Sequence, residues 1–312
     1  VVGQTTFQAN TTGVTGAAAS LVSPSLLLLG LGAFNMTNVS NDVDTIAASV
    51  GGSLDYRDAD TTSIGSVGGT DGLRSGTGVA TGGNIQVIIT TGTLNVDQVV
   101  STLAGAGGSV TIGSGVSLNV ANSLTPGAGN ITLRSNDANG DILITQPQSF
   151  DFDLLLQANR DIIISDNLQT INNHTITLRA DFNDNGVGGV WVQSTGYVNS
   201  ASTLTISGAD LFDATAGNAD PDSVFIDNDG STVQIQSATT MSLANSAAAP
   251  AGADIILTGV IEAGTNLTIT ALDAINQGGT STLSSLDGDI TLTAANWNIN
   301  DSGSASAELE VF

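Results

Sequence analysis

Four stretches of the chain share one pattern: Thr175-Ile-Thr-Leu-Arg, Thr203-Leu-Thr-Ile, Asn266-Leu-Thr-Ile and Asp289-Ile-Thr-Leu. Each opens with a polar turn residue and then alternates apolar with polar side chains. This alternation is typical of a strand that has one face in a core and the other in water. Clusters of Gly, Asn, Asp and Ser, which form tight turns, separate such stretches. The pattern predicts an all-β protein.

The strands also recur at a regular interval. Counting from the first core residue of the clearest ones, the spacings are 24, 21, 28, 29 and 22 residues, taken over Ile131, Leu155, Ile176, Leu204, Val233 and Ile255. A recurring unit of this length predicts a β-solenoid, in which these residues point inward in successive coils. An array of β-sandwiches is the alternative, because it also has short alternating strands, but sandwich strands seldom share a consensus.

Composition excludes several classes of protein. The net charge of -24 and the pI near 4.1 oppose phosphate backbones, so we expect neither nucleic-acid binding nor attraction to anionic membranes. The longest apolar stretch, Ser25 to Phe34, is about half of the ~20 residues that a membrane-spanning helix needs. The chain has no Cys, and its five basic residues are all Arg, which excludes thiol and lysine chemistry.

The sequence predicts three segments. Residues 1–40 combine a strand-like start with an apolar Leu run and are expected to form an N-terminal cap or a subunit-contact segment. Residues 41–300 are expected to form the solenoid repeats, and residues 301–312 a strand-like C-terminal tail. Because a solenoid leaves open ends, we expect end-to-end homopolymerisation or continuation within a longer adhesin.

The repeats resemble those of very large bacterial surface proteins of the filamentous-haemagglutinin type. The stretches that resemble them include Asn41 to Asp60, Leu154-Leu-Leu-Gln-Ala-Asn-Arg-Asp-Ile-Ile-Ile and Ile176-Thr-Leu-Arg-Ala-Asp-Phe-Asn-Asp-Asn-Gly. The resemblance covers about residues 41 to 300 as a style of repeat. It implies a secreted, right-handed parallel β-helix that serves as an adhesin, stalk or filament.

Paired carboxylates raise the question of an enzyme. Of the Asp-x-Asp pairs, Asp151/Asp153 has aromatic neighbours and a strand-like context. Residues two apart on a strand lie about 7 Å from one another, within the range that inverting glycosidases use. The Gly-His-Gly, adjacent Asp-Asp and Arg-x-Lys elements of β-helix hydrolases are absent, however, and the single His174 is expected at a solvated turn. We therefore expect no enzyme and no catalytic residue.

Calcium is the better functional interpretation of the Asp clusters. Asp181, Asn183 and Asn185, followed by Gly186, match the first half of an oxygen-ligand loop, but Val192 stands where an EF-hand has Glu. Asp137, Asn139 and Asp141 form a similar turn, as do Asp227 and Asp229. Ordinary turn chemistry is the other interpretation, since Asp, Asn and Gly are also what a sharp bend requires. No cofactor other than calcium is expected.

The sequence thus predicts an extracellular structural or adhesive protein of a bacterial surface. A rod or filament subunit is the favoured form, with surface glycans as candidate partners. The alternatives are a carbohydrate-active β-helix enzyme, either a polysaccharide hydrolase or a lyase, and a passive glycan-binding module.

Overall fold

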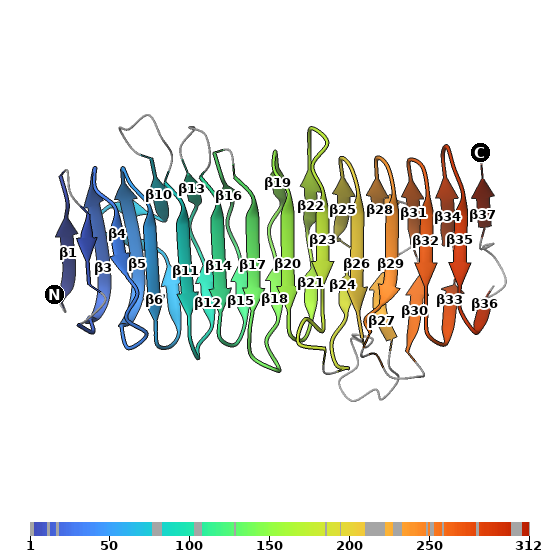
Figure 1. The fold of residues 1–312 in the computed structure, drawn as a ribbon, viewed down its shortest axis with the longest axis horizontal. Helices are drawn as coiled ribbons and strands as arrows, with labels where there is room; N and C mark the ends of the chain where they lie inside the picture. The colour runs from blue at the N-terminus through green and yellow to red at the C-terminus, as the bar shows by residue number, and fades with distance from the viewer. Residues whose placement is uncertain are drawn as a thin grey trace. The chain divides into compact units, whose positions relative to one another are not determined.

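The computed structural model consists of stacked parallel strands, which confirms the predicted β-solenoid (Figure 1). The chain divides into unit 1, Val1–Ile142, and unit 2, Leu143–Phe312. No helix in the described part of the chain is long and apolar enough to span a membrane. The structure describes residues 3–10, 13–16, 19–76, 83–102, 108–127, 129–184, 186–193, 195–209, 222–226, 233–247, 249, 253–257, 259–278, 281–300 and 308–311.

Unit 2 has three parallel sheets, and the chain visits them in turn. Sheet 1 contains β21(Ile162–Ile164), β24(Val190–Val192), β27(Asp222–Ile226), β30(Asp254–Leu257), β33(Ala274–Gly278) and β36(Asn296–Asn300). Sheet 2 contains β20(Leu154–Ala158), β23(Ile176–Arg179), β26(Leu204–Gly208), β29(Met241–Asn245), β32(Leu267–Thr270) and β35(Ile290–Thr293). Sheet 3 contains β19(Gln148–Phe150), β22(Asn167–Thr170), β25(Tyr197–Ser200), β28(Val233–Ser237), β31(Val260–Ala263), β34(Thr282–Ser285) and β37(Glu308–Val311).

Unit 1 is also built of parallel strands, but its repeating strands belong to two sheets, and two long strands stand at its start. Its larger sheet contains β1(Gln4–Gln8), β3(Val22–Gly30), β5(Asp42–Val50), β7(Thr62–Ile64), β10(Leu73–Ser75), β12(Leu94–Val96), β13(Val100–Thr102), β15(Leu118–Val120) and β16(Leu124–Thr125). Its smaller sheet contains β2(Val14–Thr15), β4(Phe34–Met36), β6(Leu54–Asp58), β11(Ile85–Ile89), β14(Val110–Ser114) and β17(Ile131–Ser135). β18(Ile142–Ile144) spans the boundary between the units.

The N-terminal segment belongs to this parallel ladder. β1 pairs with β3 and β3 with β5, all in parallel, and β2 and β4 continue the smaller sheet. β5 is long enough to pair with β7 near its middle and with β10 near its end. In the next coil of unit 1, two separate strands make these pairings: β12 pairs with β7, and β13 pairs with β10.

Apolar side chains stack in register along the core of each unit. In unit 2 one inward column of sheet 2 runs through Leu154, Ile176, Leu204, Met241 and Leu267, each at most 1% exposed. Full burial of one such side chain contributes about 1.5–3 kcal/mol. A single coil has no partner for this column, so the stability comes from stacking.

The predicted inward residues are mostly confirmed. Ile131, Ile176, Leu204 and Ile255 are fully buried. Leu155 is the error: it faces outward and is half-buried, while Leu154 and Leu156 point into the core. The phase was wrong because three consecutive Leu residues give no alternation from which to read it, and a shift of one residue exchanges the faces of a strand. The Val233 side chain lies outside what the structure describes.

One hairpin interrupts the coils of unit 1. β8(Ser66–Val67) and β9(Thr70–Asp71) form the one antiparallel pair among the described strands. Gly68 and Gly69 at its turn have φ of 59° and 84°, as a two-residue turn of the type I′ class requires. Gly72 then leads into β10 with φ of 68°, and a Cβ there would lie 1.9 Å from the Val99 carbonyl oxygen. Only glycine satisfies this position.

Candidate functional site

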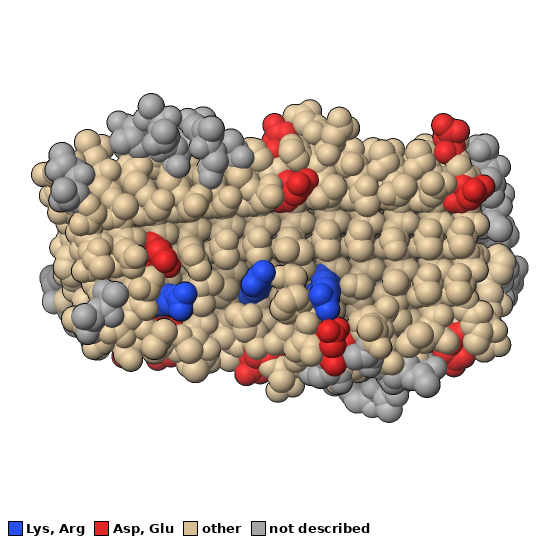
Figure 2. Space-filling view, viewed as in Figure 1, with Lys and Arg blue, Asp and Glu red and all other residues tan. Residues whose placement is uncertain are grey.

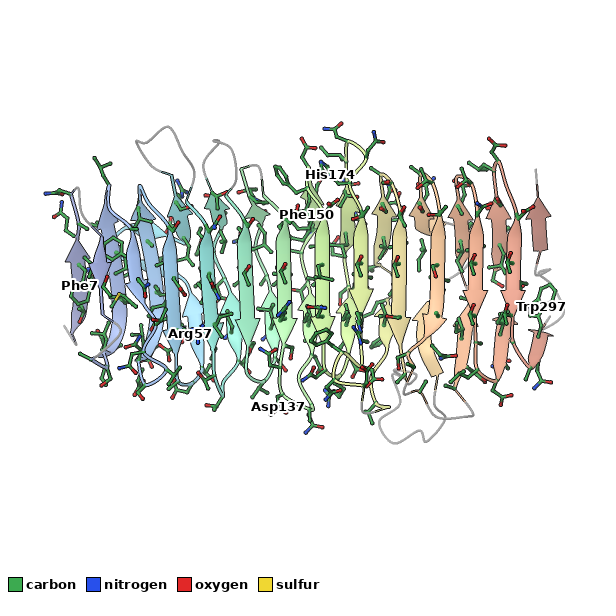
Figure 3. The ribbon with its side chains drawn as sticks, viewed as in Figure 1. Phe7, Arg57, Asp137, Phe150, His174 and Trp297 are labelled. Atoms are coloured by element: carbon green, nitrogen blue, oxygen red, sulfur yellow. The ribbon has the colours of Figure 1, made fainter. Side chains whose placement is uncertain are left out.

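Two adjacent corners of unit 2 bring together the paired carboxylates and the single histidine. Asp151 and Asp153 lie between β19 and β20. His174, labelled in Figure 3, lies one coil further on, between β22 and β23. The imidazole Nε2 is 3.5 Å from Oδ1 of Asp151, and Nδ1 is 3.4 Å from Oδ1 of Asp153. We call Asp151, Phe152, Asp153, Asn172 and His174 the histidine corner.

The strand-like context predicted for the Asp pair is wrong. Asp151 and Asp153 occupy the bend after β19, so the spacing expected for neighbours on one strand face does not apply. The turn predicted for His174 is confirmed. It is formed by Asn172 and Asn173, which have φ of 55° and 65°, a left-handed conformation that Asn tolerates better than most residues.

Hydrogen bonds hold the two corners together. The Thr175 backbone N–H donates to Oδ1 of Asp153 at 2.9 Å, and the Thr175 hydroxyl donates to the same oxygen at 3.1 Å. The Asn172 amide donates to Oδ1 of Asp151 at 2.9 Å. The Phe152 ring centroid lies 5.9 Å from that of the imidazole. Every one of these contacts joins neighbouring coils, so the corner fastens one coil to the next.

The electrostatics do not match a glycosidase pair. The Thr175 backbone N–H is the main cause that lowers the pKa of Asp153, with further contributions from the Thr175 hydroxyl and from His174. A glycosidase acid needs a raised pKa so that it still holds a proton near neutral pH. Asp153 is therefore set up as a carboxylate that accepts hydrogen bonds.

Nor does the corner form a metal centre. Its two carboxylates face opposite nitrogens of one imidazole, so the three groups do not converge on a common point. Across the described residues, no group of three or more His, Asp or Glu side chains is arranged to hold a metal ion.

The loop predicted to bind calcium is closed by internal hydrogen bonds. Asp181 is fully buried, with φ of 50°, and its Oδ1 accepts the Gly186 N–H at 3.1 Å. Asn183 is exposed, and Asp184 forms an ion pair with Arg179 at 3.0 Å. Asn185 lies outside the described residues.

Of the other two predicted calcium turns, the structure describes one. Asp137 projects from the turn after β17 (Figure 3), and its Oδ1 accepts the Asn139 N–H at 2.9 Å, as in an Asx-turn. Asp141 is buried beside this turn. Asp227 and Asp229 lie outside the described residues, so calcium there stays a prediction.

Buried hydroxyls at strand ends are a feature that sequence reasoning missed. The Ser237 hydroxyl lies 2.6 Å from the Ser202 carbonyl oxygen and 2.8 Å from that of Thr240. Ser200 contacts the carbonyl oxygens of His174 and Thr203 in the same way. We call these residues corner serines, because each ties the turn between sheets 3 and 2 to the previous coil. A Ser at the last inward position of a strand was the available signal.

No family model matches the chain, and no curated protein or solved structure shows significant similarity to it.

Proposed function

We propose that the chain is a structural or adhesive segment of an extracellular bacterial surface protein of the filamentous-haemagglutinin type. In unit 2, each further coil adds one parallel strand to each of the three sheets. Such a ladder suits a spacer whose length grows with the number of coils. The solenoid fold supports the structural role. The resemblance of the repeats, described under the sequence analysis, is the basis for proposing this family.

One face of unit 2 supports the adhesive role. The outward positions of β26, β29 and β32 are occupied by Thr205, Ser207, Ser242, Ala244, Thr268 and Thr270. Neighbouring strands place these residues in two columns, at about 4.8 Å per strand. Figure 2 shows no charged residue over these strands and acidic residues at the margins. In a chain of net charge -24, this neutral hydroxyl face is the observation on which the proposal rests.

A neutral hydroxyl face suits contact with neutral, hydroxyl-rich material such as a surface polysaccharide. The test is adhesion of the whole chain to surfaces coated with neutral polysaccharides, compared with the Thr268→Glu variant. We expect the added charge to reduce adhesion at least threefold. Gln169→Glu, which adds the same charge on the outer side of β22, is the matched control and should adhere as the unchanged chain does. Equal adhesion of all three proteins would refute the role of this face.

Assembly is part of the same proposal. The backbone N–H and C=O groups at the edge of a coil stack can pair with another strand, either from further coils or from a second copy of the chain. Electron microscopy of the purified chain distinguishes single particles from end-to-end polymers. Divalent cations belong in this test, because calcium would screen the mutual repulsion of such acidic chains.

A carbohydrate-active enzyme is the second candidate, and the histidine corner is the observation that favours it, with Asp153 in the role of an ionised carboxylate and not of the acid. Carboxylates, an imidazole and an aromatic ring lie together at a half-exposed surface. A screen on acidic and neutral polysaccharides, repeated with Asp153→Asn and Asp151→Asn, tests it. Product release that both variants abolish would establish an enzyme, and release that persists in both would place the activity elsewhere.

A further inference from the structure

The β8–β9 hairpin forms a pocket on the outer surface of unit 1. It folds over the outer face of β3 and β5, where Val67 packs against Leu27 and Ala47, and all three side chains are at most 5% exposed. This packing covers apolar groups that would otherwise face water, so the hairpin is anchored. Between it and the sheet lies a pocket of about 250 Å³, lined by Ser49, Gly69, Thr70, Asp71 and Arg74.

Arg74 supplies the charge of this pocket. It faces outward from β10, where it is in register with Ser49 of β5 on one side and Ser101 of β13 on the other. A hydroxyl residue therefore flanks the guanidinium position along the ladder in both directions. Of these two, Ser49 lines the pocket, and Thr70, from the hairpin, adds a second hydroxyl to its wall.

Arg74 forms no ion pair or hydrogen bond with any other residue in the described ranges. Arg160 and Arg179, by contrast, pair with Asp161 at 3.1 Å and with Asp184 at 3.0 Å. The carboxylate in the pocket, Asp71, accepts the Ser66 hydroxyl at 2.5 Å. The guanidinium thus keeps its donors for a ligand, in a chain that has five basic and 29 acidic residues.

The chemistry of the pocket selects the ligand. A guanidinium binds a planar carboxylate through two parallel hydrogen bonds. Ser49 and Thr70 can exchange hydrogen bonds with hydroxyl groups, and the second oxygen of Asp71 can accept one. The net charge of -24 repels polyanions over a long range, which disfavours highly charged ligands. The volume suits a single sugar ring and is below the range of about 300–1,000 Å³ of drug-sized ligand pockets.

We infer that this pocket binds the carboxylate of one acidic sugar residue, with Arg74 as its anchor. An isolated uronate in an otherwise neutral polysaccharide and a sialate on a cell-surface glycan share this chemistry. The inference goes beyond the proposed function and does not depend on it, because the pocket belongs to unit 1 and the neutral hydroxyl face to unit 2.

The test is saturation-transfer NMR on the full chain with glucuronate, N-acetylneuraminate, glucose and N-acetylglucosamine. For a ligand of this size with one bidentate contact, we expect a Kd on the order of 1 mM. Arg74→Gln should weaken binding at least about tenfold, since a charge-assisted pair is lost. Thr70→Val, which keeps the shape of the side chain, should weaken it a few fold.

Arg179→Gln is the matched control, because it removes the same charge outside the pocket and should bind within about twofold of the unchanged chain. Circular dichroism of each variant verifies folding, and Arg74 is exposed, so its replacement leaves the core intact. Binding of glucuronate or of N-acetylneuraminate identifies which source of the carboxylate fits. Equal binding by Arg74→Gln, equal binding of the neutral sugars, or equally strong competition by inorganic phosphate would each overturn the inference.

Discussion

The hydroxyl of Ser246 donates a 2.6 Å hydrogen bond to Oδ2 of Asp181, across 65 residues of sequence. Ser246 follows β29 and Asp181 follows β23, so the bond bridges the coil between them. Both oxygens of the Asp181 carboxylate therefore accept hydrogen bonds from the protein. A side chain that the sequence offers as a calcium ligand serves here as an internal clamp.

Replacing Asp181 with Asn tests the clamp. Asn tolerates the left-handed backbone at this position, so the substitution removes the charge without straining the chain. The amide oxygen can accept the Gly186 N–H, but the amide nitrogen can only donate to Ser246, and both bonds lose their charged partner, which is a difference of about 1–1.5 kcal/mol per bond. We expect the free energy of unfolding in urea to fall by this amount for each bond. Asp184→Asn, at an exposed ion pair, should change it by less than about 1 kcal/mol; equal effects would refute the clamp.

Calcium removal is the second prediction. Asp181 and Asp137 already accept hydrogen bonds within their own turns, so an ion would have to displace these donors. We expect the same melting temperature in chelator and in calcium at about 5 mM, which is on the order of an extracellular concentration. A ligand stabilises a fold only by binding its native state. If calcium instead raises the melting temperature, and Asp137→Ala or Asp227→Ala abolishes that increase, the predicted site at the substituted residue is established.

The corner serines give the third prediction. Ser237 is 1% exposed, and its one O–H lies within hydrogen-bond distance of two carbonyl oxygens, that of Thr240 in its own turn and that of Ser202 in the previous coil. Ser237→Ala removes the single donor that these two carbonyl oxygens share, and we expect a loss of about 1–2 kcal/mol in the free energy of unfolding. Ser242→Ala, on the outer side of β29, is the control and should lie within about 0.5 kcal/mol of the unchanged chain. Identical midpoints in urea for the two variants would contradict this role.

The alternating strands allowed the fold to be predicted, and the exceptions have physical causes. In Thr203-Leu-Thr-Ile the alternation of polar and apolar residues shows which side chains face inward, so Leu204 was placed correctly. The run from Leu154 to Leu156 has no such alternation, so its inward residues could not be identified. Gly68-Gly69 between short polar strands is a hairpin signal that a search for repeats passes over, because the hairpin belongs to no coil.

The histidine corner could not be predicted in the same way. Asp153 and His174 meet because their turns occupy the same corner in successive coils, and the sequence interval of 21 residues gives no information on which corner each turn forms. Coil lengths in this chain vary, so register had to come from the structure.

The dependence of stability on pH is the last prediction, and it concerns Asp153. Its folded pKa lies below the ordinary value, chiefly because the Thr175 backbone N–H binds the ionised form. A depressed carboxyl pKa contributes stability that is present above the unfolded value of about 3.9 and is lost as pH falls through the folded pKa. Because the side chain is half-exposed, with 48% of its surface accessible, we expect the contribution to be less than about 1 kcal/mol.

Urea unfolding of the unchanged chain and of Asp153→Asn, at intervals from pH 6 to pH 2, measures this contribution. The difference in unfolding free energy between them should be constant down to about pH 4 and then shrink as the carboxylate takes up its proton. His174→Gln separates the causes, because the imidazole ranks behind the Thr175 N–H, so this variant should keep most of the pH dependence. A difference between the unchanged chain and Asp153→Asn that stays the same from pH 6 to pH 2 would mean that the Thr175 hydrogen bond does not favour the ionised form.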